Sequence, residues 1–376
     1  MTGERDTASA PRGGVPKPGN AGPGAPRSAA PAGAARPLPA RPAGLAAALA
    51  AEAPVLDVRN LAAWYFTDEG TVKAVDGVGF KLGKGKTLGL VGESGCGKTA
   101  TGLAVLGLLP PPGRVVRGEA VLGRRDLLRM PEADLAAMRG RDIAMIFQEP
   151  MSALDPLMTA GEQIAECLEM HTALDRRERA EKAVELLASV GVPEPALRAK
   201  AWPHELSGGM RQRVVIAMAL ACDPKVVIAD EPTTALDVTV QAQILDLIED
   251  TQERTGMGVI LVTHDLAAVA QAADEVAVMY AGVLVETGPV KDVYAHPAHP
   301  YTKALLGSIP VVGQAARQLV TIPGRVPNLA RLPSGCRFAD RCPLAESACR
   351  AVEPDLVDLG AGRRVRCILA TGRAAR

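Results

Sequence analysis

The chain has 376 residues, and its 42 basic residues (Lys and Arg) balance its 42 acidic ones (Asp and Glu), so its formal net charge is zero. This length allows two domains and an appendage, and a neutral chain has no net field that would draw it onto nucleic acid or anionic lipid. With 48% hydrophobic residues, seven cysteines and no apolar run of about 18 residues, the composition excludes a collagen, a small disulfide-bonded secreted domain and an integral membrane protein.

Residues 1–53 differ from the rest of the chain. Ala, Gly and Pro make up 34 of them, whereas large aliphatic side chains number only four (Val15, Leu38, Leu45 and Leu49). Such a segment cannot bury enough apolar surface to offset the entropy lost on ordering it. It also lacks the basic start and continuous apolar stretch of a signal peptide. We therefore expect a disordered tail, with a misassigned start codon as the alternative.

From Val55 onwards the pattern becomes that of a globular domain. Apolar β-branched runs predict strands, and apolar residues at helical spacing predict helices. Strands are expected at 55–58, 77–82, 88–91, 226–229 and 259–262, and helices at 99–109, after Asp175 and between the last two strands. Asp175 and Glu178 have the spacing of a capping box. This alternation of strands and helices predicts an α/β fold with a mostly parallel sheet.

Residues 92–99 carry the complete pattern G-x-x-x-x-G-K-[ST] of a phosphate-binding loop, or P-loop. Glycines let backbone N–H groups turn inward at a helix start and form a nest for anions. Lys98 would place its charge between the β- and γ-phosphates of a nucleotide, and the Thr99 hydroxyl would bind Mg²⁺. A flexible glycine loop is the alternative, but the strand before and the helix after favour a nucleotide site. The expected nucleotide-binding residues here are Gly92, Glu93, Ser94, Gly95, Cys96, Gly97, Lys98, Thr99 and Ala100.

Asp230 and Glu231 follow the predicted strand at 226–229. In P-loop folds such a strand lies beside the P-loop strand. Asp230 would then hold Mg²⁺ through its water shell, and Glu231 would polarise the attacking water. Taken alone, the two acids could equally be an exposed strand end before Pro232. Together with the P-loop they predict a nucleoside triphosphatase.

Residues 206–213 form a second phosphate-binding pattern, Leu-Ser-Gly-Gly-Met-Arg-Gln-Arg. Ser207, Gly208 and Gly209 open a helical stretch, and a helix start of this kind attracts anions. One chain has one P-loop and one such helix start, which suggests that the second serves a nucleotide held by a partner. The segment resembles the LSGGQ signature of ABC-type ATPases.

The resemblance to ABC ATPases implies roles for further residues. Gln148 matches the Q-loop, which senses the γ-phosphate, contributes to the Mg²⁺ site and couples to transmembrane subunits. Asp237 matches the D-loop (residues 235–237), and His264 matches the switch histidine. Tyr65 matches the aromatic residue that stacks on adenine, with its neighbours Trp64 and Phe66 as alternatives. The catalytic residues implied by the resemblance are Glu231, His264, Gln148 and Lys98.

The same resemblance implies a fold and an assembly. The fold is an α/β P-loop NTPase of the ABC type, with a RecA-like core, an antiparallel strand layer and a helical subdomain at about residues 149–225, all within residues 54–305. Two cassettes would bind two ATP molecules head to tail. Ser207 and Gly209 of one cassette would then face the γ-phosphate held by the other.

Three segments narrow the resemblance to the ATP-binding subunits of oligopeptide and dipeptide importers, and among these to the D-type rather than the F-type subunit. They are residues 229–243, 279–282 and 299–306. The implied partners are a second ATPase subunit (as a heterodimer), two transmembrane permease subunits and an extracytoplasmic peptide-binding protein, without nucleic acid. The implied location is the cytoplasmic face of the plasma membrane.

Three alternatives stay open at this point. The nearest is the same machine with another cargo, such as nickel chelates. A soluble ABC ATPase acting on DNA or ribosomes would usually carry two cassettes or a long coiled coil, and this chain has neither. A non-hydrolytic interaction module would not need Glu231 and His264.

Residues 306–376 are rich in Pro, Arg and Cys, and we expect them to form a separate small module. Its cysteines, Cys336, Cys342, Cys349 and Cys367, are spaced C-x5-C-x6-C-x17-C and lack the tight pairs typical of zinc sites. Four thiolates can hold a [4Fe–4S] cluster, and the family resemblance favours that cofactor. Zinc and free thiols are the alternatives.

Overall fold

The computed structural model describes residues 53–233, 237–308 and 322–372. The chain divides into two units, residues 1–43 and 44–376, and every described residue belongs to the second. Apart from Ala53, the expected disordered tail lies outside the described residues. So do Ala235 and Leu236 of the expected D-loop.

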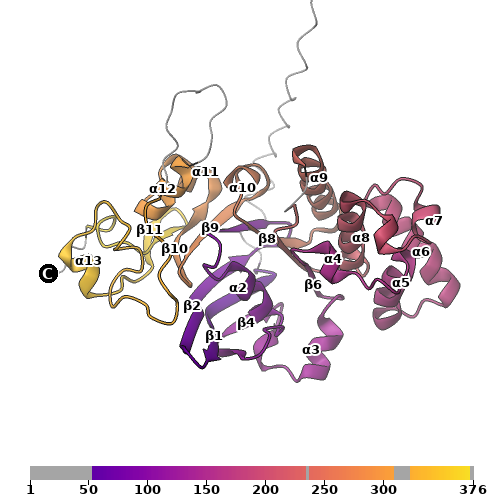
Figure 1. The fold of residues 1–376 in the computed structure, drawn as a ribbon, viewed down its shortest axis with the longest axis horizontal. Helices are drawn as coiled ribbons and strands as arrows, with labels where there is room; N and C mark the ends of the chain where they lie inside the picture. Colours follow the sequence, from indigo (N-terminus) through magenta and orange to yellow (C-terminus); the bar gives the residue numbers. More distant parts are fainter. Residues whose placement is uncertain (1–52, 234–236, 309–321, 373–376) are drawn as a thin grey trace, which may run out of the picture. The chain divides into compact units, whose positions relative to one another are not determined.

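The elements follow one another as drawn in Figure 1. The strands are β1 (Leu56–Thr67), β2 (Gly70–Leu82), β3 (Thr87–Val91), β4 (Gly113–Leu122), β5 (Arg125–Asp126), β6 (Ile143–Ile146), β7 (Val226–Asp230), β8 (Gly258–Thr263), β9 (Glu275–Tyr280), β10 (Val283–Pro289), β11 (Val357–Gly360) and β12 (Arg363–Val365). The helices are α2 (Lys98–Val105), η1 (Leu127–Arg129), α3 (Glu132–Met138), α4 (Pro150–Ala153), α5 (Ala160–His171), α6 (Arg176–Ser189), α7 (Pro195–Arg198), η2 (Pro203–Glu205), α8 (Gly208–Leu220), α9 (Val238–Thr255), α10 (Leu266–Ala272), α11 (Val290–Ala295), α12 (Pro300–Gly307) and α13 (Ser347–Ala351).

The strands form two sheets. The larger has the order β11-β12-β10-β9-β3-β8-β7-β6. Its strands from β9 to β6 are parallel, and the other three add antiparallel pairs at one side. The smaller sheet, β2-β1-β4-β5, is antiparallel. The prediction of an α/β fold is therefore confirmed, and β3, β7 and β8 cover the expected residues. The expectation that the acidic strand β7 lies beside the P-loop strand β3 is wrong, because β8 lies between them in the sheet.

The central strands are buried on both faces, as their continuous Val, Ile and Leu runs predict. Side chains alternate across a strand, so neighbouring residues supply two different cores. Val91 and Leu261 belong to the core that includes the helices α5, α6 and α8. Leu90 and Val262 belong to the core beneath β1, β2 and α2. The large sheet is thus the partition between two apolar layers.

Helices α4 to α8 lie within residues 150–220, and Figure 1 shows α5, α6, α7 and α8 grouped together. The capping box expected at Asp175 is confirmed. The Asp175 carboxylate accepts the Glu178 N–H at 2.9 Å, and the Glu178 carboxylate accepts the Asp175 N–H at 2.7 Å. Among the described residues, no helix combines the length and apolar character needed to span a bilayer.

The C-terminal residues continue the large sheet. Strand β12 pairs with β10, where Glu286 lies opposite Val365, and β11 pairs with β12. The Glu286 side chain is fully buried. It accepts the N–H groups of Ala298 and His299, both at 2.8 Å, and an N–H of Arg363 at 3.1 Å. These contacts fasten β12 to the segment that leads into α12.

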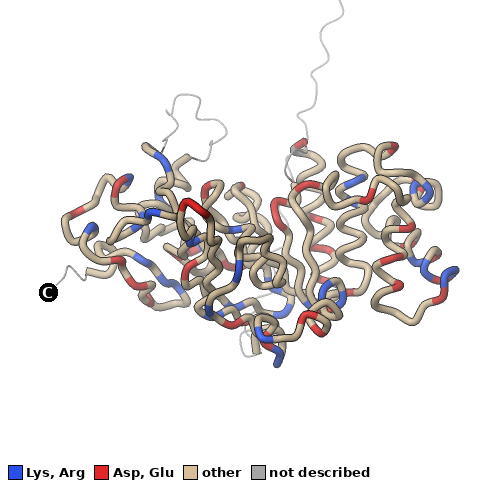
Figure 2. Tube along the Cα trace, turned by 60° about the horizontal axis from the view of Figure 1, so that its bottom comes forward, with Lys and Arg blue, Asp and Glu red and all other residues tan. Residues whose placement is uncertain are grey.

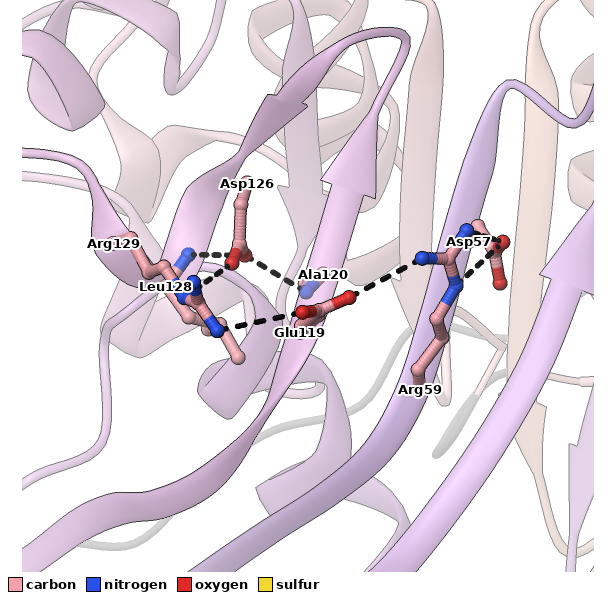
Figure 3. Close-up of polar contacts among 7 residues, drawn as sticks. All are labelled: Asp57, Arg59, Glu119, Ala120, Asp126, Leu128 and Arg129. Carbon is pink, nitrogen blue, oxygen red and sulfur yellow. Dashed lines mark hydrogen bonds and ion pairs between the residues drawn. The ribbon is translucent and has the colours of Figure 1, made fainter.

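Charged side chains of both signs are interspersed along the chain, as Figure 2 shows. Figure 3 shows one network that joins β1 to β4 and η1. Arg59 donates to Asp57 at 2.6 Å and to Glu119, its register partner on β4, at 3.2 Å. Glu119 also pairs with Arg129 at 3.4 Å. Because most of these groups are exposed, each pair contributes at most about 1 kcal/mol.

Gly89 offers a test of the packing between β3 and α10. A Cβ atom at this position would lie 2.5 Å from a methyl carbon of the buried Val269. We expect Gly89→Ala to lower the free energy of unfolding by about 1–3 kcal/mol, as overpacking does. Shortening the neighbour should relieve the clash, so Gly89→Ala with Val269→Ala should be more stable than the sum of the single losses. Urea denaturation measures all three variants, and additive losses would contradict the packing argument.

Candidate active site

The P-loop (residues 92–99) joins the end of β3 to the start of α2. Gly97 caps the helix in the left-handed region, with φ of 105°. A Cβ there would lie 2.0 Å from the Ala74 carbonyl oxygen, and a Cβ at Gly92 would lie 2.2 Å from the Met279 carbonyl oxygen. Both positions need glycine because the loop backbone packs directly against β2 and β9. This close contact holds the concave loop in shape.

Lys98 is buried and folds back over the loop. Its Nζ donates to the carbonyl oxygens of Gly92 at 2.8 Å and Glu93 at 3.2 Å. Ser94 and Gly95 form the exposed tip of the loop, whereas Cys96 is fully buried. Burial raises the pKa of the Cys96 thiol to about 11, so this cysteine is a packing residue rather than a nucleophile.

Thr99 and Asp230 meet at the junction of α2 and β7. The Thr99 hydroxyl donates to the Asp230 carboxylate at 3.1 Å. Burial raises the pKa of Asp230, the hydrogen bond from Thr99 opposes that shift, and the negative charge of Glu231 reinforces it. A hydroxyl and a carboxylate side by side are the oxygen ligands that Mg²⁺ prefers. A Mg²⁺ ion therefore fits the chemistry of this donor pair.

Glu231 brings two other expected catalytic residues together. One carboxylate oxygen accepts the side-chain N–H of Gln148 at 2.9 Å, and the other lies 3.2 Å from Nδ1 of His264. Glu231 has φ of 45°, in the left-handed region that a non-glycine residue adopts only at a cost. Such backbone strain gathers at functional sites. The three residues come from the ends of β6, β7 and β8, which the parallel sheet brings to one edge.

The signature residues lie at the start of helix α8, in the group formed by α5 to α8 (Figure 1). Ser207 caps α8, and its hydroxyl accepts the Met210 N–H at 3.3 Å. Among the described residues, none beyond its chain neighbours and its own helix backbone lies within 4 Å of a Cβ placed at Gly208, whereas a Cβ at Gly209 would lie 3.4 Å from Val240 of α9. Asp237 caps α9 and accepts the Val240 N–H at 2.9 Å. The open face at Gly208 has room for a partner.

The three aromatic residues of β1 divide between two faces of the strand, as strand alternation requires. The rings of Trp64 and Phe66 lie 6.4 Å apart, with Lys73 over Trp64 and Arg114 over Phe66. Tyr65 is half-buried, and its ring would clash with a Cβ at Gly113. Stacking on adenine thus stays a prediction for Tyr65.

The structure adds contacts to the P-loop that the sequence did not indicate. The Glu93 carboxylate binds both terminal nitrogens of Arg341, at 2.6 and 2.9 Å, and the Glu93 N–H donates to the Tyr301 hydroxyl at 2.9 Å. Arg341 is 248 residues away in the chain. Its position before Cys342 is the only sequence feature near it, and that feature does not indicate a contact with the P-loop.

All seven cysteines are free thiols. Cys336, Cys342, Cys349 and Cys367 line one small cavity together with His299 and Phe338. Burial raises the pKa of the Cys336 thiol to about 11 and also raises that of Cys342. Within the described parts of the chain, no group of three or more His, Cys, Asp or Glu side chains is arranged to hold a metal ion. The four thiols therefore share a cavity without forming a finished metal site.

Two protein families match the chain. Residues 75–234 match the family "ABC transporter", and residues 285–349 match "Oligopeptide/dipeptide transporter, C-terminal region". The dipeptide transport ATP-binding protein DppD of Bacillus subtilis is 48% identical over 321 residues, which is 85% of this chain and 96% of that protein. The oligopeptide transport ATP-binding protein AppD of Bacillus subtilis is 48% identical over 84% of this chain and 96% of its own length. DppD of Escherichia coli is 45% identical over 83% of this chain and 96% of its own.

Solved structures support the same assignment. The ATP-binding cassette MJ0796, in a dimeric post-hydrolysis state bound to ADP and Pi, aligns with a TM-score of 0.56 and 27% identity. The alignment covers 62% of this chain and 98% of the cassette. A P-loop, an acidic strand end and a capped signature helix thus occur on a cassette fold, in a chain nearly half identical to these curated relatives. The chain belongs to the family of ABC transporter ATP-binding proteins that carry the oligopeptide/dipeptide transporter C-terminal region.

Proposed function

We propose that this chain is the ATP-hydrolysing subunit of an ABC importer for dipeptides or oligopeptides. The observation that carries the proposal is the Glu231 carboxylate, which lies between Gln148 and His264 beside the Asp230–Thr99 pair. The names of the relatives, which describe dipeptide and oligopeptide transport ATP-binding proteins, supply the cargo.

The P-loop binds the triphosphate of ATP in this proposal. Its backbone N–H groups and the start of α2 attract the phosphates. Lys98 exchanges its present carbonyl partners, Gly92 and Glu93, for the β- and γ-phosphate oxygens. Thr99, Asp230 and Gln148 would hold Mg²⁺, which neutralises charge on the phosphates when it is bound. Tyr65 stacks on the adenine.

Glu231 acts as the general base for the attacking water, with Asp230 left to the metal. Its side chain is 13% exposed, whereas that of His264 is 62% exposed. The largely buried Glu231 carboxylate is held by Gln148, while the exposed His264 ring can turn from Glu231 towards a γ-phosphate. General-base assistance of this kind accelerates hydrolysis by roughly 10²–10⁴-fold.

The signature of a second cassette completes each ATP site. Ser207, Gly208 and Gly209 present the start of the 13-residue helix α8, and Gly208 is open to contact. A helix start of this kind complements the negative γ-phosphate. The dimeric state in the description of the cassette MJ0796 supports this arrangement. Asp237 caps α9, whose Val240 is the neighbour of Gly209, and would lie at the same interface.

The permease contact lies beside Gln148. Exposed apolar side chains follow it along the chain, with Met151 at 54% and Leu157 at 81% exposure. Large exposed apolar patches mark interaction sites, and we place the permease contact at these side chains. We assign this contact to the transmembrane permease, which has two subunits. A second ATPase subunit and an extracytoplasmic peptide-binding protein complete the importer. The ATPase subunits lie on the cytoplasmic face of the plasma membrane. The ATPase domain would span residues 54–305, with the helical subdomain at about 149–225.

The four C-terminal cysteines form the second site of the proposal, within a module at residues 306–376. Support comes from their convergence on one cavity and from thiol chemistry, since four thiolates bind a [4Fe–4S] cluster or Zn²⁺. Thiols whose pKa is raised by burial, as at Cys336, must lose protons to bind metal. Metal affinity therefore rises with pH through the neutral range.

Replacing Glu231 tests the catalytic proposal. Glu231→Gln should retain ATP binding and lower the ATPase rate of the assembled transporter by about 10²-fold or more, because the amide cannot accept the proton of the attacking water. Nucleotide-binding titration and phosphate release measure the two effects. Lys98→Ala is the control for binding, and it should lose ATP affinity. Near-normal turnover by Glu231→Gln would remove Glu231 from the role of base.

Peptide uptake tests the cargo. A strain whose chromosomal gene encodes Glu231→Gln should fail to accumulate a labelled dipeptide, while wild-type cells accumulate it. Nickel uptake measured in the same cells addresses the alternative cargo. Loss of nickel uptake with unchanged peptide uptake would contradict the peptide proposal and favour metal chelates.

Metal analysis tests the cysteine site. Protein purified without oxygen should be brown and contain iron and sulfide, and Cys336→Ser should lose both. Cys167→Ser is a matched control, because this half-buried thiol lies in α5, outside the cysteine cavity. Colourless protein with stoichiometric zinc would show that the site binds zinc instead of a cluster. Protein without either metal would contradict the metal site.

A further inference from the structure

The segment between the first two C-terminal cysteines, residues 336–342, lies against the nucleotide site. We call this segment the cysteine loop. It directs Arg337, Phe338 and Arg341 into the protein, and each of these residues is less than one tenth exposed. Two of the three are arginines, which are rarely buried unless they are paired. Their partners show what the loop does.

Arg341 binds the P-loop directly. Two of its nitrogens donate to the two carboxylate oxygens of Glu93, at 2.6 and 2.9 Å, in a bidentate pair. Its Nε donates to the Pro323 carbonyl at 2.8 Å, and one terminal nitrogen lies 3.3 Å from the Tyr280 hydroxyl. The planar guanidinium is thus fixed on several sides, and it fixes Glu93 in turn.

Arg337 reaches the P-loop through one intermediate turn. Its side chain donates to the Ala281 carbonyl at 2.7 Å and to Asp76 at 2.7 Å. The next residue in that turn, Gly282, donates its N–H to the carbonyl of Cys96 in the P-loop at 2.9 Å. The turn is therefore clamped between the cysteine loop and the P-loop.

Phe338 packs between these two connections. Its ring lies 5.2 Å from Tyr280 and 5.3 Å from Tyr301. The Tyr301 hydroxyl accepts the N–H of Glu93 at 2.9 Å. The Glu93 side chain is thus held by Arg341 of the cysteine loop. The Glu93 N–H is held by Tyr301, which packs against Phe338 of the loop.

We propose that the cysteine loop positions the P-loop for nucleotide binding, with Arg341 as the positioning residue. Through this residue, a change at the four cysteines, such as substitution or metal binding, alters the affinity for nucleotide. Arg341 fixes the first turn of the P-loop and also neutralises the carboxylate of Glu93, which is adjacent to the phosphate nest. An unpaired carboxylate there would repel a triphosphate. Cys342 lines the cysteine cavity and is the next residue in the chain, so we expect a change at the cysteines to reach Arg341 through the backbone. The inference rests on the proposed nucleotide site.

Equilibrium titration of the full chain with a fluorescent ATP analogue and Mg²⁺ tests this role. Arg341→Gln should weaken binding about 10-fold, which is within the usual range for coupled neighbours. The kcat of the assembled transporter at saturating ATP should stay within about 2-fold, because Arg341 does not reach the reacting atoms. Arg341→Lys, which keeps the charge, should recover part of the affinity. It also serves if Arg341→Gln does not fold.

Arg350→Gln is the matched control. Arg350 lies in the same C-terminal segment and pairs with Asp340, but both side chains are largely exposed. Its removal should leave nucleotide affinity unchanged. Equal loss of affinity in the Arg350 and Arg341 variants would mean that any damage to this segment weakens binding, and would overturn the assignment of Arg341.

A double-mutant cycle tests whether Arg341 acts on nucleotide affinity through Glu93 or only through a general loss of structure. Glu93→Gln removes the negative charge, so Arg341→Gln should cost much less affinity in that background than in wild type. Cys342→Ser should weaken binding in wild type and add little in Arg341→Gln. If the fold-losses of affinity of the single variants simply multiply in both double variants, the residues act independently, and the proposal is overturned.

The iron and zinc contents of the same samples distinguish this proposal from that of the metal site. Samples without metal that show both couplings would contradict the metal site and support the positioning role. Wild-type protein that binds no nucleotide would contradict the proposed function itself, and this inference with it.

Discussion

The structure depends on the packing of the P-loop backbone against its neighbours without side chains between them. Gly92 lies against the carbonyl of Met279 and Gly97 against that of Ala74, so no larger residue fits at either position. These two contacts connect the loop to both sheets at once, since Met279 belongs to β9 and Ala74 to β2. The nucleotide site is therefore built where the two sheets meet, and its shape is inherited from the sheets rather than from the loop alone.

The parallel strands supply the rest of the site. Because β6, β7 and β8 are adjacent and point the same way, Gln148, Glu231 and His264 leave the sheet at one edge. Their side chains then need only short distances to meet. This explains how residues separated by 83 and 33 positions in the chain form one polar group. Ligand sites at the carboxyl ends of parallel strands are the general rule in such sheets.

Much of this could be predicted from the sequence, because the signals are local. The P-loop, the buried strands β3, β7 and β8 and the capping box at Asp175 are each encoded in fewer than ten consecutive residues. The antiparallel continuation of the large sheet by β10, β12 and β11 was not foreseen. Its pairing joins segments almost 80 residues apart, as Glu286 and Val365 show, and no local pattern records such a distance.

The same limit applies to Arg341 and Glu93. An arginine beside a cysteine suggests nothing about a glycine-rich loop 248 residues earlier, and only the folded chain brings them together. The pair is mostly buried, and removing one member of such a pair is costly, typically about 3–5 kcal/mol, because it leaves a charge without its partner.

The long separation between these two residues also bears on how the protein is made. A ribosome produces the glycine-rich loop 248 residues before its arginine partner, Arg341. The nascent chain therefore carries the loop without the Arg341–Glu93 ion pair until that arginine has been translated. If Arg341 positions the loop as proposed, full nucleotide affinity develops only after this residue has been made and has folded against Glu93.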